Sequence, residues 1–223
     1  YEGKLRKLAS QERKNLRSEE LFYSEEFRSY LQKMGDTLLR HCKKDGRFKL
    51  NVLQAGDAPG WTDGTNEYLV PENSISAAYN DIYSKFVSLL GIHFHEIAHI
   101  LYCDFTAENK AMAAIKSGKF YGELPTPQTE EEDAVIKELT DAISNAAYRP
   151  IFVQVFNDVT NIIDDPHDEG KIIDEFGGLV EKGIIFARES LFRSFDTAEN
   201  ILAESKDKPL NAMYSLMLEF ARF

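Results

Sequence analysis

The 223-residue sequence is poor in cysteine and in positive charge, and it contains no long hydrophobic run. Its two cysteines, Cys42 and Cys103, are too few for a disulfide scaffold. No uninterrupted apolar run reaches the ~18 residues of a membrane helix, so we expect no membrane span. The net charge of −11 argues against general nucleic-acid binding. The first residues of the sequence are charged and contain no apolar signal region. This favours a cytoplasmic location, although the compartment stays unknown.

The residues that are present predict a folded, mostly helical protein. A hydrophobic content of 43%, with 15 phenylalanines and 10 tyrosines, is typical of a chain with a real core. Alternating polar and apolar residues predict strands at 47–53 and 66–70, with a turn at Trp61–Gly64. We therefore predict an α+β fold, predominantly α-helical, with a small sheet at about 47–70 and a helix at about 74–102. The regions 1–45 and 46–223 are the expected divisions of the chain.

The remaining helices are predicted from apolar spacing and from their end signals. Ser24 and Thr129 are suitable N-caps, and Pro166 is expected to end the helix that begins at Pro150. The last predicted helix is rich in apolar residues, which indicates packing on a partner domain or protein at the C-terminus. The other helices are expected at 3–22, 27–42, 107–117, 129–149, 150–165, 179–194, 197–205 and 209–222.

The most informative motif is H-E-x-x-H, formed by His95, Glu96 and His99. Positions i and i+4 share one face of a helix, so the two imidazoles can bind one zinc ion. Glu96 follows the first ligand directly and is placed to act as a general base on a water molecule. The alternative is a pair of core histidines beside a solvated glutamate. Cys103, at i+4 from His99, is either a thiolate ligand or a buried free thiol.

A catalytic zinc ion needs a third protein ligand, and no third histidine follows at the expected spacing. Polar residues interrupt the apolar helix at 157–165, where Asn161, Asp164 and Asp165 share a face. We predict Asp164 as the third ligand, with Asp165 or Asn161 against a ligand histidine. The other candidates are Asp158, Asp165 and His167. Alternatively, the acids of this Asp-Asp-Pro sequence are solvated at a helix end.

With these motifs, the chain resembles zincin metallopeptidases of the gluzincin type, whose third ligand is an acidic residue on a later helix. The region 47–170 is similar to peptidase domains associated with von Willebrand factor A-type domains. Those domains have an N-x-x-E-D-like signature after H-E-x-x-H, and here the matching run is Asn161 to Asp165. Asp164 stands where the signature has glutamate. The resemblance implies a zincin-like domain over 46–223.

The function implied is hydrolysis of peptide or protein substrates by one Zn²⁺ ion, with His95, His99 and Asp164 as metal ligands and Glu96 as catalytic base. An edge strand near Tyr68 is expected to hold the peptide. Two alternatives are a non-catalytic zincin-like module that binds metal or peptide in a protein interaction, and hydrolysis of a non-peptide amide. The candidates for stabilising the oxyanion are Tyr79, Tyr121 and Tyr148.

Overall fold

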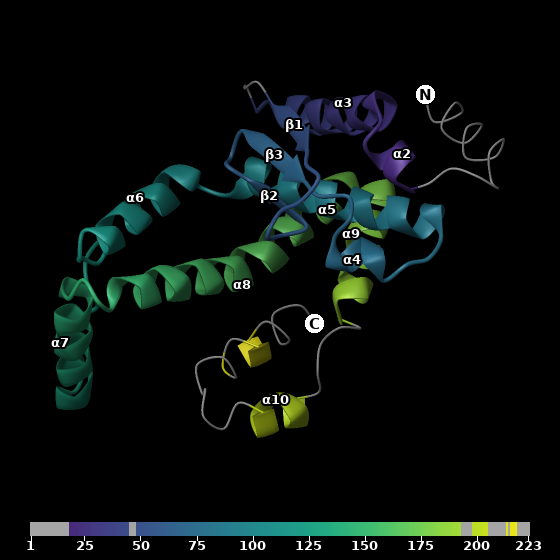
Figure 1. The fold of residues 1–223 in the computed structure, drawn as a ribbon. Helices are drawn as coiled ribbons and strands as arrows, with labels where there is room; N and C mark the ends of the chain where they lie inside the picture. The colour runs from purple at the N-terminus through teal and green to yellow at the C-terminus, as the bar shows by residue number, and fades with distance from the viewer. Residues whose placement is uncertain (1–17, 45–47, 193–197, 205–212, 214, 218–223) are drawn as a thin grey trace. The chain divides into compact units, whose positions relative to one another are not determined.

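The structure, a computed structural model, describes residues 18–44, 48–192, 198–204, 213 and 215–217 (Figure 1). The described part is mostly helical with one three-stranded mixed sheet, which confirms the predicted fold class. The chain divides into two compact units, 1–103 with 167–196 and 104–166 with 197–223. The boundary falls inside one long helix, α8 (Arg149–Phe176), which is a single continuous element.

The sheet of the first unit has the strand order β1-β3-β2. Strand β1 (Lys49–Val52) pairs in parallel with β3 (Asn66–Leu69), and β2 (Gly60–Thr62) pairs with β3 antiparallel. The predicted turn at Trp61–Gly64 is therefore partly wrong, because Trp61 and Thr62 belong to β2. The turn begins at Asp63, whose Oδ1 accepts hydrogen bonds from the backbone N–H groups of Thr65 (2.9 Å) and Asn66 (2.7 Å).

Among the described residues, the helices that lie wholly within the first unit are α2 (Ser18–Phe22), α3 (Glu25–His41), α4 (Ser74–Ala77), α5 (Ile82–Tyr102) and α9 (Gly178–Phe192). Ser24 caps α3 as predicted, with its side chain accepting from the N–H of Phe27 at 3.2 Å. The single helix predicted over 74–102 is wrong. Asn73 caps α4 and Asp81 caps α5, so the backbone leaves the helical path between them.

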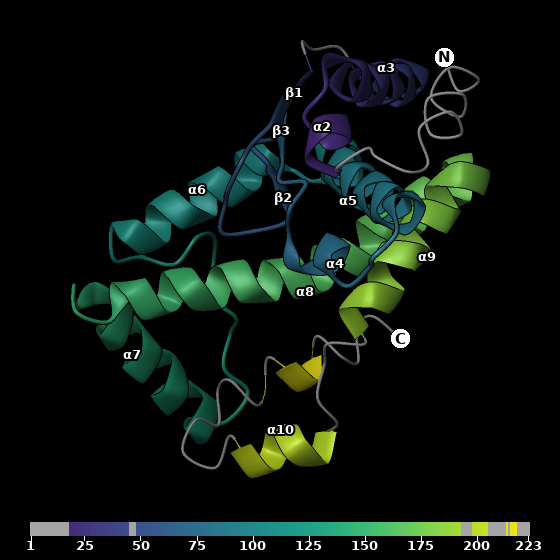
Figure 2. The ribbon, with the colours of Figure 1, turned by 45° about the vertical axis from the view of Figure 1, so that its right-hand side comes forward.

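Helix α5 lies at the centre of the first unit, with contacts to α3, the sheet and α9 (Figures 1 and 2). Its residues from Ser88 to Phe94 are all buried, as expected for a helix covered on several sides. Leu50 and Leu69 of the sheet, Ile172 of α8 and Ile184 of α9 complete this core. The central position of α5 means that any polar side chain pointing inward from it needs a specific partner.

Helices α5 and α9 approach closely where Gly91 faces Gly183. A Cβ atom built on Gly91 would lie 2.6 Å from Cβ of Ala187 and 2.8 Å from the carbonyl carbon of Gly183. Such distances are too short for real side chains, so only glycine allows this separation of the two helices. The predicted helix over 179–194 is thus present and is anchored to α5 near its middle.

The second unit contains α6 (Phe105–Lys116), α7 (Glu130–Ser144), the first part of α8 and α10 (Ala198–Glu204). Thr129 caps α7 as predicted, and Gly118 follows α6 with a positive φ of 83°. The Arg149 guanidinium donates to the carbonyl oxygens of Lys116 (3.5 Å) and Ser144 (2.9 Å). This side chain therefore binds carbonyls near the C-terminal ends of α6 and α7.

The expected helix end at Pro166 is wrong, because α8 continues ten residues further, to Phe176. Proline has no N–H, so the carbonyl of Ile162 loses its usual intrahelical partner, at a typical cost of ~3 kcal/mol. Residues beyond the proline compensate by burial: Asp168, Glu169 and Ile172 are all more than nine-tenths buried in the first unit. Tertiary contacts thus override the local breaking signal.

The helix predicted over 3–22 lies outside the described residues except for α2, and the one predicted over 209–222 lies mostly outside them. Among the described residues, no single helix has both the length and the apolar character to cross a membrane. Helices α5 and α6 meet that test only when they are taken together as a broken pair.

Candidate metal centre

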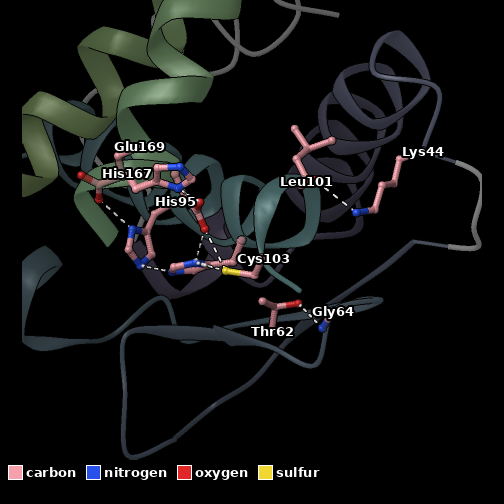
Figure 3. A network of polar contacts seen from close by, with 10 residues as sticks. Lys44, Thr62, Gly64, His95, Leu101, Cys103, His167 and Glu169 are labelled. Carbon is pink, nitrogen blue, oxygen red and sulfur yellow. Dashed lines mark hydrogen bonds and ion pairs between the residues drawn. The ribbon is translucent and has the colours of Figure 1, made fainter. Parts of the chain in front are cut away.

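Two histidines of α5 converge on one point. The Nε2 atoms of His95 and His99 are 3.1 Å apart, and their rings lie nearly perpendicular, with centroids separated by 4.5 Å. The opposite ring nitrogens point to carboxylates: His95 Nδ1 is 2.7 Å from Glu169, and His99 Nδ1 is 3.1 Å from Asp168. Figure 3 shows these contacts between α5 and α8. Each imidazole therefore has one nitrogen held by an acid and the other directed at its neighbour.

This arrangement selects the tautomer that a metal ion requires. A carboxylate accepts hydrogen bonds, so each Nδ1 bears the proton and donates, which leaves the lone pair on Nε2. Zinc binds imidazole nitrogen at about 2.0–2.1 Å in tetrahedral geometry, which places two ligand nitrogens ~3.3 Å apart. The separation of 3.1 Å between the two Nε2 atoms is close to that value. The histidine pair thus fits a tetrahedral metal ion.

The acids that face these histidines come from one face of α8. Asp165, Asp168 and Glu169 are spaced i, i+3 and i+4 along the continuous helix, and all three are more than nine-tenths buried. Ligand atoms of His95, His99 and Asp165 all lie within 4.8 Å of one another and form a candidate metal-binding group. Asp168 and Glu169 contact the Nδ1 atoms of His99 and His95, respectively.

Both carboxylate oxygens of Asp168 have hydrogen-bond partners. Its Oδ2 accepts from the Cys103 thiol (2.8 Å) and His99, and its Oδ1 lies 2.8 Å from His167 Nδ1. Burial raises the pKa of Asp168, but hydrogen bonds from His99, Cys103 and His167 outweigh that effect and lower its pKa overall. Asp168 is therefore ionised at neutral pH and can orient His99.

Cys103 contributes as a hydrogen-bond donor. Burial, together with the neighbouring Asp168 carboxylate, raises the pKa of its thiol to about 11, although His99 opposes this. The thiol is thus protonated at neutral pH and donates to Asp168. Ligand atoms of His99, Cys103 and Asp168 also lie within 4.8 Å of one another, on the Nδ1 side of His99.

The site contains several buried carboxylates. Glu96, Asp168 and Glu169 are each more than nine-tenths buried. Arg188 of α9 forms an ion pair with Glu169 through its guanidinium group. Burying carboxylates costs several kcal/mol per ion unless cations compensate.

Glu96 lies against the edge strand β2. A Cβ atom built on Gly60 would be 3.2 Å from Glu96 Oε1 and 2.7 Å from a methyl carbon of Ile92, so the strand backbone passes directly beside the helix here. Only a residue without a side chain fits at position 60 without moving Glu96. The motif glutamate is thereby brought beside β2, an edge strand of the described sheet.

A second buried pair fixes the sheet to α5. His93 Nδ1 is 2.7 Å from Glu67 Oε2, and both side chains are fully buried. Burial raises the pKa of Glu67, and the neighbouring His93 opposes this. Since β2 pairs with β3, the strand of Glu67, this contact also positions β2 relative to the motif helix.

Of the predicted ligands, the structure brings His95 and His99 together, whereas Asp164 falls in a different candidate group. That group consists of Cys103, Glu108 and Asp164, whose ligand atoms lie within 4.8 Å of one another. Asp158 accepts from Gln154 at 2.7 Å, and the half-exposed His167 contacts Asp168. The assignment of Asp164 as a zinc ligand stays a prediction, and the geometry favours Asp165.

The other predicted site features are distributed differently. Tyr68 lies in the central strand β3, so the expected edge strand near it is wrong, and β2 is an edge strand of the described sheet. Tyr79 stacks on Phe186 of α9, with ring centroids 4.7 Å apart. Tyr121 and Tyr148 belong to the second unit, where each is about half exposed.

Sequence reasoning missed Asp168, Glu169 and Arg188. The signal for the two acids was present, because their spacing from Asp165 is that of one helix face, but it required α8 to continue through Pro166. Arg188 had no local signal, since its partner belongs to another helix. No protein-family model, curated protein or solved structure matches the chain, and the function is therefore inferred from these side chains.

Proposed function

We propose that this protein is a zinc-dependent metallopeptidase of the zincin type. The observation that carries the proposal is the convergence of His95 Nε2 and His99 Nε2 at 3.1 Å, with each Nδ1 held by a buried carboxylate. Asp165 is the third ligand in this proposal. Oriented imidazoles with a carboxylate behind each are the usual arrangement around catalytic zinc.

The chain supplies the remaining groups for amide hydrolysis. When bound, zinc would polarise the scissile carbonyl and activate a water molecule. Glu96 is adjacent to His95 in the sequence, and its carboxylate would act as the general base, holding a proton from the attacking water and passing it to the leaving amine nitrogen. Low exposure of Glu96 keeps the carboxylate in a poorly hydrated environment, which favours proton transfer.

Strand β2 offers a surface for an extended peptide. It is an edge strand of the described sheet and lies beside Glu96 at Gly60. A peptide that adds to this edge would gain main-chain hydrogen bonds and would run past the general base. This role falls to β2, since Tyr68 belongs to the central strand.

The proposal is tested by Glu96→Gln, which keeps the size of the side chain and removes its basicity. With a library of fluorogenic peptides, we expect wild-type cleavage that is abolished by a chelator, restored by zinc and reduced ~100-fold or more in the variant. Zinc content, measured by elemental analysis, should be equal in both proteins because Glu96 is not a ligand.

The matched control is Glu181→Gln, an exposed glutamate on α9 that should leave cleavage unchanged. Unchanged cleavage by Glu96→Gln would contradict the mechanism. A wild-type protein that binds zinc and peptides without cutting them would instead favour the non-catalytic module.

A further inference from the structure

The ion pair between Arg188 and Glu169 connects a third helix, α9, to the carboxylate that contacts His95. Arg188 comes from α9, Glu169 from α8 and His95 from α5, and the contacts run in that order through one carboxylate. One oxygen of Glu169 is 2.7 Å from His95 Nδ1, and the other oxygen contacts the Arg188 guanidinium. The two oxygens of one acid thus have separate partners.

We propose that Arg188 is a positioning residue for metal binding, acting through Glu169 on His95. The proposal rests on the proposed metal site. Glu169 must stay buried and must present one fixed oxygen if it is to direct His95 Nε2 at the metal. The guanidinium binds the second oxygen, which prevents the carboxylate from rotating away, and its positive charge compensates the buried negative charge.

The packing of α9 explains why an arginine can act here. The contact of Gly91 with Gly183 brings α9 close to α5, and Arg188 lies five residues further along α9. The Arg188 side chain is three-quarters buried, and its Nε atom has no hydrogen-bond partner among the described residues. Its guanidinium group forms an ion pair with Glu169, so we expect the energetic effect of Arg188 to depend on that residue.

The test is a double-mutant cycle on the dissociation constant of zinc, measured by competition with a chromophoric chelator. Arg188→Gln and Glu169→Gln are each expected to weaken zinc binding ~10-fold or more, as is typical when a group behind a metal ligand is removed. The double variant should bind no more weakly than Glu169→Gln alone. Arg188→Lys keeps the charge and should restore most of the affinity.

A spectroscopic measurement separates positioning from general stability. The visible absorption of the Co²⁺-loaded protein reports ligand geometry, and we expect it to shift in Arg188→Gln and to return towards wild type in Arg188→Lys. Lys182→Gln, an exposed charge on the same helix, is the matched control and should alter neither affinity nor spectrum. If Arg188→Gln does not fold, Arg188→Met, which also removes the charge, completes an equivalent cycle with Glu169→Gln.

The inference is overturned if Arg188→Gln binds zinc like wild type, or if its effect is the same with and without the Glu169 carboxylate. It also fails if the wild-type protein binds no zinc. A protein that shows the expected cycle but cleaves no peptide would refute the proposed peptidase activity and leave the role of Arg188 intact.

Discussion

Adjacent aspartates on α8 have different surroundings, although their side chains are chemically identical. Asp165 is grouped with His95 and His99, whereas Asp164 has a ligand atom near Glu108. Because successive helical residues point about 100° apart, one helix cannot present both acids equally to the same ion.

We expect Asp165→Asn to weaken zinc binding more than ~100-fold, and Asp164→Asn to change it by less than ~3-fold. Titration with a chelator measures both, and a larger loss in Asp164→Asn would restore the sequence-based assignment.

At the scale of helices, the crossing of α5 and α9 is limited by Gly91. We expect Gly91→Ala to lower the free energy of unfolding by about 2 kcal/mol or more, because the new methyl group meets the Gly183 backbone and Ala187. The normal helical preference for alanine, ~1 kcal/mol, opposes this loss only partly. Urea unfolding followed by circular dichroism gives the difference.

Gly170 of α8 provides the matched control, because a Cβ atom built there meets nothing within 4 Å. Gly170→Ala should leave stability unchanged or raise it by up to ~1 kcal/mol. Equal effects of the two substitutions would show that the α5–α9 contact does not limit packing. Loss of zinc affinity in Gly91→Ala would in addition link the crossing to the position of Arg188.

For the whole molecule, metal binding should appear as stability, because ligands from α5 and α8 are held together only when the chain is folded. At a free zinc concentration 100 times the dissociation constant, the expected stabilisation is about 2.7 kcal/mol. For a chain of this length, that corresponds to a rise of roughly 5–10 °C in melting temperature. Scanning calorimetry with zinc and with a chelator measures it.

The zinc-dependent rise in melting temperature should differ between two variants. Glu96→Gln should keep the full zinc-dependent rise, whereas Asp165→Asn should lose most of it. Identical melting temperatures of the wild-type protein with zinc and with chelator would contradict metal binding at the histidine pair.

The sequence by itself determined the elements whose signals are local. The caps at Ser24 and Thr129 predicted the starts of α3 and α7 correctly, although α7 ends at Ser144, before the predicted end at 149; alternation predicted β1 and β3. The spacing of His95 and His99 likewise required only a helix to put both rings on one face. These features depend on residues within a few positions of one another, which is why local physical chemistry was sufficient.

Only the tertiary structure decided what lies opposite the histidines. The burial of Asp168, Glu169 and Ile172 accompanies the continuation of α8 through Pro166, a proline whose local preference is to end a helix. In the continuous α8, Glu169 and Asp168 contact the Nδ1 atoms of the two histidines. Helix α9 contributes Arg188, and it approaches α5 at a glycine contact that no local pattern predicts. Long-range packing therefore completes the centre, because the free energy of buried charges depends on partners distant in sequence.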